Sequence, residues 1–404
     1  MDDQSKGNLL FQNVNLATMA AGEDDIGIQY QCDVLIQNGV ITAIGPDLST
    51  DSNIPLVEGK GRWLLPGFVD SHTHLVFGGH RADEFRRRLR GESYQSIAQS
   101  GGGIKKSVSQ TREATEEALL KSASRRLRRL AAEGVTTIEV KSGYGADLET
   151  EIKMLNVAKT LGQQHPVNII PTFLGAHTMP PEGEISTDAY IDAVCSQMIP
   201  EIAKRQLAKN IDVFCENIAF SATQCERVFV AAQQYGMHIK AHVEQLSYMG
   251  GAAMAAKYKA LSVDHIEYLT NDDVALLKKS GTVAALLPGA YYYLKESQLP
   301  PIEALRRLQV PMAVATDYNP GTSPLASLLT AANMACVMFG LTTEEALLGI
   351  TRCGAQALGL TRKGQIKVGY DADLTLWSID EPACLVYEIN GFKPDMIVVG
   401  GKCV

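Results

Sequence analysis

Residues 64–74, LLPGFVDSHTH, mark the point where the sequence changes character. Downstream of this stretch, apolar runs rich in β-branched residues alternate with helix-like segments such as 112–134 and 221–236. Near-continuous apolar runs are typical of strands buried on both faces of a sheet. Eight such runs occur, at 67–74, 135–145, 167–177, 211–220, 237–245, 261–268, 282–290 and 311–321. This alternation predicts a (β/α)8 TIM-like barrel.

Both ends of the chain have a different pattern. Residues 9–18, 32–45 and 56–65 alternate loosely between apolar and polar side chains, and the Asn38-Gly39 pair is a strong hairpin signal. Strand-like stretches return at 364–378 and 395–404. We therefore predict a small β-sandwich domain formed by both termini, residues 1–63 and 364–404. The barrel, residues 64–363, is inserted between them.

The composition argues against several classes of partner. Lys and Arg total 37 and Asp and Glu total 45, so the formal net charge is -8. An acidic chain has no electrostatic means of holding a polyanion, and no apolar run is long enough to span a bilayer, so we expect neither nucleic-acid nor membrane partners. The eight cysteines form no CxxC pair and the first ten residues lack a signal-peptide pattern. We expect a cytoplasmic protein with reduced thiols.

Histidines gather at the carboxyl ends of the predicted barrel strands, where barrels of this kind build their active sites. His72 and His74 lie two residues apart on one strand, so their side chains point to the same face. His242 ends the fifth strand and Asp317 ends the eighth. Three imidazoles and one carboxylate are a ligand set for zinc or iron. These four residues form the predicted metal centre; for Asp317 alone the alternative is a helix N-cap.

Three more residues on the predicted barrel strands have polar side chains with a possible role. His265 ends the sixth strand and is available as a general base, since imidazole changes charge near neutral pH. Its alternative role is a buried, hydrogen-bonded histidine. By parity, His238 and Lys240 share the face of His242 but lie deeper. We interpret His238 as barrel filling, and we expect Lys240 to find a carboxylate or the rim of the barrel because burying an unpaired ammonium is costly.

Several motifs resemble those of known enzymes. The segments LLPGFVDSHTH, KAHVEQL, VDHIE and ATDYNPG, with a split β domain ending in GQIKVGYDADLTLW, resemble the metal-dependent amidohydrolase superfamily over essentially the whole chain. The segments HLVFGGHRADEF, SGGGI, EVKSGYG, FLGAH and DYNPGTSP are similar, more specifically, to the imidazolonepropionase family of histidine degradation. That resemblance implies hydrolysis of the ring amide of 4-imidazolone-5-propanoate to N-formimidoyl-L-glutamate.

The resemblance also implies site residues. The metal ligands of such enzymes fall on the four residues named above, with one zinc or iron ion per chain. Substrate contacts fall on Arg81, Tyr144, His177, Gln245 and Thr322, and product contacts on Tyr144, Asn319 and Gly321. In some members a glutamate proposed as an acid/base group occupies the position of Gln245; here the amide can only orient the ring. Relatives are often homodimers, so we expect a homodimer.

The implied chemistry is attack of metal-activated water on the ring carbonyl. We expect Asp317 and His265 to take the proton from this water, and His177 or His265 to help stabilise the oxyanion. Two-metal relatives commonly place a lysine at the end of the fourth strand. Here that strand offers Cys215 and Glu216 but no lysine, so we expect one metal. Glu216 is then expected to support the site by hydrogen bonding, not to bind a second ion.

Arg81 suits the propionate of the implied substrate. A guanidinium holds a carboxylate through two parallel hydrogen bonds, and Tyr144 offers a second donor. The alternative for Arg81 is a pair with Asp83 or Glu84 at a helix start. The long segment 78–105, with its three glycines at 101–103, is interpreted as a loop over the barrel mouth, because it lacks the Lys-Ser/Thr that follows a phosphate-binding loop.

Two other functions compete with this one. Another cyclic amidohydrolase or a deaminase on the same barrel would act on a hydantoin, a dihydroorotate or a nucleobase. A neutral nucleobase does not need the carboxylate-binding set of Arg81, Tyr144 and Thr322. A non-catalytic scaffold of this fold should have lost metal ligands, whereas this chain keeps all four and His265 as well.

Overall fold

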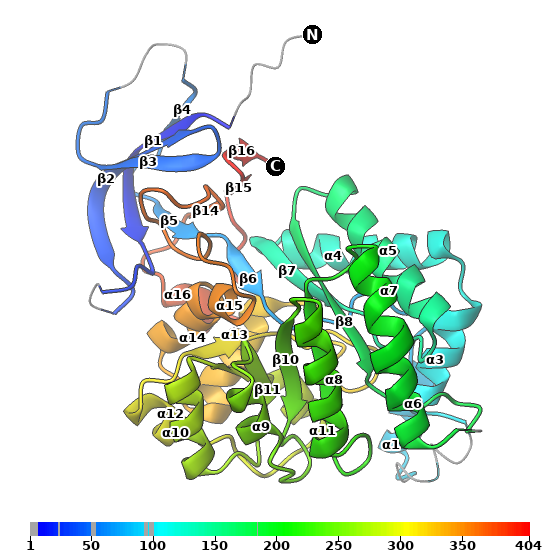
Figure 1. Ribbon diagram of the computed structural model, residues 1–404. Coiled ribbons are helices and arrows are strands. Elements are labelled where there is room, and N and C mark those ends of the chain that lie inside the picture. Colours follow the sequence, from blue (N-terminus) through cyan, green and yellow to red (C-terminus); the bar gives the residue numbers. More distant parts are fainter. Residues whose placement is uncertain (1–6, 23–24, 50–53, 93–95, 97–100, 184) are drawn as a thin grey trace.

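The eight predicted barrel strands form one parallel sheet in chain order (Figure 1). The computed structural model describes residues 7–22, 25–49, 54–92, 96, 101–183 and 185–404. Each predicted run contains one strand, and most strand residues are buried. The strands are β6 (Phe68–Asp70), β7 (Val135–Lys141), β8 (Asn168–Ala176), β9 (Asn210–Cys215), β10 (His238–Val243), β11 (Ser262–His265), β12 (Val283–Leu286) and β13 (Met312–Val314).

The barrel closes beyond the ends of its first and last strands. In the described part of the chain, β6 and β13 do not pair directly, but the segments that follow them do, through a parallel bridge between Thr73 and Tyr318. The Asp317 amide donates to the His72 carbonyl at 3.0 Å, and the His74 amide donates to the Tyr318 carbonyl at 3.0 Å. We call these paired segments, 72–74 and 317–318, the closing seam.

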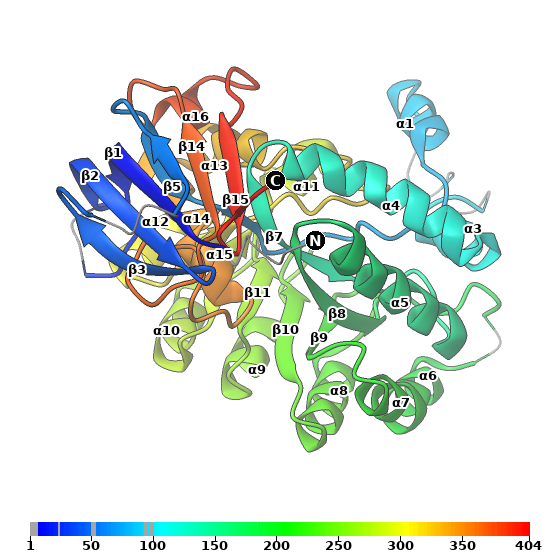
Figure 2. The same cartoon turned by 90° about the horizontal axis from the view of Figure 1, so that it is seen from above.

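Helices surround the barrel (Figures 1 and 2). Seven of the described helices begin at a Ser, Thr or Asp side chain that accepts an amide hydrogen bond, for example Thr115 before α4 and Ser221 before α8. The helices are α1 (Ala82–Leu89), α3 (Ile104–Glu113), α4 (Glu116–Ala131), α5 (Leu148–Gln164), α6 (Thr187–Ala193), the π-helix η1 (Val194–Met198), α7 (Ile199–Lys204), α8 (Ala222–Gln234), α9 (Gly251–Lys257), α10 (Asn271–Ser280), α11 (Pro288–Leu294), α12 (Ile302–Arg307), α13 (Leu328–Phe339), α14 (Thr343–Gly349), α15 (Arg352–Ala357) and α16 (Cys384–Tyr387). None of the described helices is long and apolar enough to cross a membrane.

The two chain ends share a second sheet beside the barrel (Figure 2). Its strands are β1 (Leu9–Ala17), β2 (Ile28–Gln37), β3 (Val40–Gly45), β4 (Leu56–Glu58), β5 (Trp63–Pro66), β14 (Leu374–Trp377), β15 (Met396–Val399) and β16 (Lys402–Cys403). The β14 strand from the tail runs antiparallel to β5 from the head. Asn38 and Gly39 both have positive φ, as the predicted hairpin turn requires.

This terminal sheet differs in detail from the expected sandwich. A sandwich has two separate sheets, whereas hydrogen bonds here join all eight described strands in the order β16-β15-β14-β5-β1-β2-β3, with β4 beside β1. Its apolar side chains, including Phe11, Val34 and Leu374, form a core separate from that of the barrel. The stretch 364–378 is strand only over its last part, because residues 364–373 form turns and loops.

Candidate metal centre and active site

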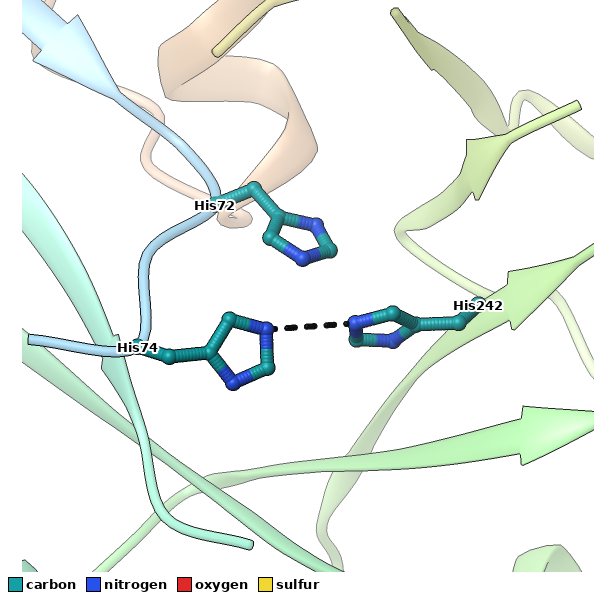
Figure 3. A group of neighbouring side chains, drawn as sticks. All are labelled: His72, His74 and His242. Atoms are coloured by element: carbon teal, nitrogen blue, oxygen red, sulfur yellow. Dashed lines mark hydrogen bonds between the residues drawn. The ribbon is translucent and has the colours of Figure 1, made fainter. Parts of the chain in front are cut away.

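Four side chains converge beside the closing seam (Figure 3 shows the three histidines). The Nε2 atoms of His72 and His74 each lie 3.5 Å from Asp317 Oδ1, and His242 Nε2 lies 3.4 Å from His74 Nε2. A tetrahedral zinc site with bonds of about 2.0–2.1 Å places its ligand atoms roughly 3.3–3.4 Å apart. The distances between these side chains therefore fit a tetrahedral metal ion.

The protonation of these groups also fits a metal. His72 Nδ1 faces Asp264 Oδ2 at 2.6 Å and His242 Nδ1 faces Asp212 Oδ1 at 3.1 Å, so each ring donates from Nδ1 and keeps the Nε2 lone pair for a ligand bond. Burial lowers the pKa of His72 and His74 well below the ordinary value. Among the described residues, His72 Nε2 is buried without a hydrogen-bond partner.

Asp317 needs a cation nearby. It is 2% exposed, and burial raises the pKa of its carboxyl well above the usual range. A metal ion at the converging Nε2 atoms would hold it as a carboxylate. The alternative of a helix N-cap fails, because the next helix after Asp317 is α13, whose cap is Ser327, and the intervening stretch is fully described.

The backbone is unusual at three strand ends around this centre. Asp317 has φ 51° and Glu244, after β10, has φ 49°. His265 and Ile266, at the end of β11, have φ 80° and 67°. A β-branched residue at positive φ is an outlier, and such strain clusters at functional sites. These turns redirect the chain at the point where the side chains enter the barrel mouth.

The eight other predicted site residues line one cavity of about 390 Å³ at this mouth, together with His74, His242 and Asp317. They are Arg81, Tyr144, His177, Gln245, His265, Asn319, Gly321 and Thr322. A larger hollow of about 790 Å³ lies elsewhere, lined by residues such as Leu261, Pro311 and Arg352, and it includes no histidine. Polar groups that converge with a candidate metal centre favour the smaller cavity as the active site.

Arg81 makes the ion pair that was its alternative role, and its role in substrate binding stays a prediction. Its Nε donates to Glu84 Oε2 at 2.8 Å, which is the pair offered as an alternative. The guanidinium also lies against Gly321, where a Cβ would come within 2.1 Å of Nη1. Glu84 in turn accepts the Gly103 amide. The predicted mouth loop, 78–105, therefore contains a helix, α1, which is tied to the glycine-rich end of the same segment. The parts of that loop at 93–95 and 97–100 lie outside the described residues.

His177 has a defined tautomer in this cavity. Its Nδ1 donates to the Gly143 carbonyl at 2.9 Å, and burial followed by the neighbouring His242 lowers its pKa to about 3. The neutral ring therefore presents the Nε2 lone pair, which can accept a hydrogen bond from a ring N–H. This geometry argues against the expected oxyanion contact from His177, because a neutral Nε2 has no proton to donate.

Buried side chains hold the loops that carry these residues, and sequence reasoning missed one of them, Glu151. Glu151 accepts the amides of residues 143, 145 and 146 and so fixes the turn that carries Tyr144. Asn319 accepts the amides of Gly321 and Thr322. Glu216 accepts the amides of Gln245 and Leu246 and the Ser247 hydroxyl, a supporting role that matches the expectation.

The deeper barrel interior corrects one interpretation and bears out another. His238 does not fill the barrel. It is the first residue of β10, where the strand still lies at the solvent-exposed amino end, and burial begins only at the next residue. Lys240 is fully buried and finds a carboxylate, Glu139, at 3.3 Å. A second buried lysine, Lys141, was not singled out from the sequence. The sequence signal was present: β7 is wholly buried yet carries Glu139 and Lys141 on one face.

The family follows from comparison with known proteins. A model of the amidohydrolase family matches residues 63–404. The chain belongs to this family. Solved structures with the same fold include a triazine hydrolase variant (TM-score 0.77, 17% identity, 98% of this chain and 94% of that one) and an amidohydrolase from an environmental sample of the Sargasso Sea (TM-score 0.70, 19% identity, 98% and 92%).

Three curated relatives, each named imidazolonepropionase, show which members of the family the chain resembles in sequence. The protein of Pseudoalteromonas atlantica is 55% identical over 96% of this chain and 97% of its own length. The protein of Alteromonas mediterranea is 60% identical over 85% and 82%, and that of Colwellia psychrerythraea is 52% identical over 98% and 96%. Within the amidohydrolases, the chain groups with these imidazolonepropionases.

Proposed function

We propose that this enzyme hydrolyses the ring amide C–N bond of 4-imidazolone-5-propanoate to give N-formimidoyl-L-glutamate, a step of histidine degradation. One observation supports this proposal most. The same cavity is lined by candidate metal ligands, including Asp317, and by the guanidinium of Arg81, which can hold the carboxylate of the substrate. The name shared by relatives at 52–60% identity supports the same substrate.

Arg81, Tyr144 and Thr322 are proposed to bind the propionate. The Nε of Arg81 is engaged by Glu84, so the terminal nitrogens are the donors offered to the substrate. Burial raises the pKa of Tyr144, so it remains a neutral phenol and a hydrogen-bond donor. Gln245, His177 and the loop of Asn319 and Gly321 then orient the imidazolone ring and the opened product.

The residues His72, His74, His242 and Asp317 are proposed to hold one zinc or iron ion per chain. When bound, such an ion lowers the pKa of a water and polarises the ring carbonyl. The reaction adds the water oxygen to the carbonyl carbon, breaks the C–N bond and leaves a proton on the ring nitrogen. Asp317 and His265 are proposed to take and return this proton, since Gln245 cannot titrate. A cytoplasmic homodimer completes the proposal.

The test is a spectrophotometric assay with freshly generated 4-imidazolone-5-propanoate. We expect rapid loss of its ultraviolet absorbance, abolished by a chelator and restored by added zinc or iron. Product analysis should show N-formimidoyl-L-glutamate. No turnover by protein that carries about one metal per chain would overturn the substrate, and turnover unaffected by complete metal removal would overturn the metal's role. A neutral cyclic amide serves as the control substrate and should react poorly.

Replacing Gly321 with alanine should weaken substrate binding. A Cβ at this position would lie 2.1 Å from Arg81 Nη1, so the guanidinium must move away from the proposed propionate site. We expect KM to rise about tenfold with kcat nearly unchanged, since about 1.4 kcal/mol of binding is lost. Steady-state kinetics check this. Gly45→Ala, where nothing lies within 4 Å of the added Cβ, is the matched control. A wild-type KM for Gly321→Ala would contradict the proposed contact.

A further inference from the structure

Lys141 lies at the end of β7 with its ammonium among three buried carboxylates. Its Nζ is 2.5 Å from Asp212 Oδ2, 2.8 Å from Glu139 Oε2 and 3.7 Å from Asp264 Oδ2. All four side chains have no exposed surface. Burial alone would lower the pKa of Lys141, but the three carboxylates outweigh it and raise the pKa, so the side chain stays an ammonium.

Two of these carboxylates also hold the candidate metal ligands. Asp212 accepts from Lys141 through Oδ2 and faces His242 Nδ1 through Oδ1. Asp264 Oδ2 faces His72 Nδ1 at 2.6 Å and Lys141 at 3.7 Å. One ammonium is therefore connected, through one carboxylate each, to two of the candidate metal ligands, His242 and His72.

The second buried lysine provides a comparison. Lys240 approaches Glu139 at 3.3 Å and Asp264 at 3.7 Å, and it also donates to the carbonyls of Ser71 and Ala357. No contact with Asp212 is found for it among the described residues. In that same set, Lys141 is the one cation within 4.0 Å of both Asp212 and Asp264.

We propose that Lys141 is a positioning residue that fixes Asp212 and Asp264, and through them the tautomer and ring orientation of His242 and His72, and so sets the affinity of the metal centre. Partners behind metal-ligating histidines typically change metal affinity about 10- to 100-fold when removed. Without the ammonium, Asp212 loses its shortest hydrogen bond and can turn away from His242. This inference uses the metal centre of the proposed function but not its substrate.

The test keeps the buried charge constant, because removing a lysine alone leaves an unpaired carboxylate and can prevent folding. The double variant Lys141→Met/Glu139→Gln removes one positive and one negative charge. The matched control Lys240→Met/Glu139→Gln does the same but keeps the Lys141 links to Asp212 and Asp264. Metal-free protein is titrated with Co²⁺ in competition with a chromophoric chelator. The d–d absorption of bound Co²⁺ then reports the ligand geometry, and thermal unfolding reports stability.

We expect the Lys141 variant to bind Co²⁺ about 10- to 100-fold more weakly, with an altered d–d spectrum. The Lys240 control should stay within about threefold of wild type, with an unchanged spectrum. The proposal fails if both variants lose the same amount of Co²⁺ affinity. It also fails if the Lys141 variant keeps the wild-type affinity and spectrum. In either case Lys141 has only a structural role. If wild-type protein binds no Co²⁺, the proposed metal centre fails together with this inference. If metal binding behaves as expected but the imidazolone is not hydrolysed, only the proposed substrate fails.

Discussion

Asp317→Asn is expected to lower kcat by about 1000-fold or more. Asp317 is proposed as both metal ligand and proton acceptor, and its Oδ1 lies 3.5 Å from two imidazole nitrogens. An amide has nearly the same shape but carries no charge and accepts no proton in this reaction. Loss of a general acid–base group alone typically costs about 10²–10⁴-fold. Initial rates at saturating substrate, with metal content measured on the same sample, check this.

The loop around Asp317 should survive the change. Asn319 donates to the Asp317 backbone carbonyl, and the Asp317→Asn substitution leaves that bond in place. Asp273→Asn is the matched control. Asp273 is also buried, but it is the third residue of α10, where its side chain accepts the amide of the N-cap Thr270, and an asparagine side-chain carbonyl can accept the same hydrogen bond. Activity above about a tenth of wild type in Asp317→Asn would remove Asp317 from the proposed mechanism.

Arg81→Met should reduce kcat/KM by about 30- to 5000-fold, mainly through KM. Truncating one partner of a buried, hydrogen-bonded charge pair costs about 2–5 kcal/mol. The same variant should act on an imidazolone that lacks the propionate about as well as wild type does. The substrate pair therefore separates loss of carboxylate binding from general damage to the site, and kinetics on both substrates measure it.

Arg88→Met is the control for the Arg81 substitution. Arg88 lies on the same helix, with its guanidinium 4.6 Å from the centre of the Tyr293 ring, and it does not line the described cavity. Its loss should leave kcat/KM within about twofold. An equal loss on both substrates in Arg81→Met would show that Arg81 supports the fold through Glu84 and does not recognise the carboxylate.

The barrel could be predicted because its strands obey a local rule. A strand buried on both faces is a continuous apolar run, so β6 to β13 are readable one at a time. The same periodicity placed His72 and His74 on one face, and the structure brings them within reach of His242 and Asp317. Their role as metal ligands stays a prediction, as do the domain boundaries at residues 63 and 363.

The cluster around Lys141 could not be predicted from the sequence, because it depends on contacts between residues that are far apart in the chain. Two of the three carboxylates around Lys141 come from other strands, β9 and β11, and their depth relative to each other depends on the register of β9, β10 and β11. His238 was misjudged for the opposite reason: its parity was right, but parity does not say where a strand meets solvent. The loop held by Glu151 depends on backbone amides, which have no sequence signature.

The position of the metal centre on the closing seam links metal binding to the stability of the closed barrel. The two sides of the sheet meet where Asp70 accepts from Thr316, 246 residues further along the chain, and at the short paired segments just beyond. Three of the four candidate ligands belong to these segments: His72 and His74 lie on one side and Asp317 on the other. A bound ion would act as a cross-link that shortens a very long loop, much as a disulfide does. Retaining the ion and keeping the barrel shut are then a single event, so heat inactivation should begin with release of the ion.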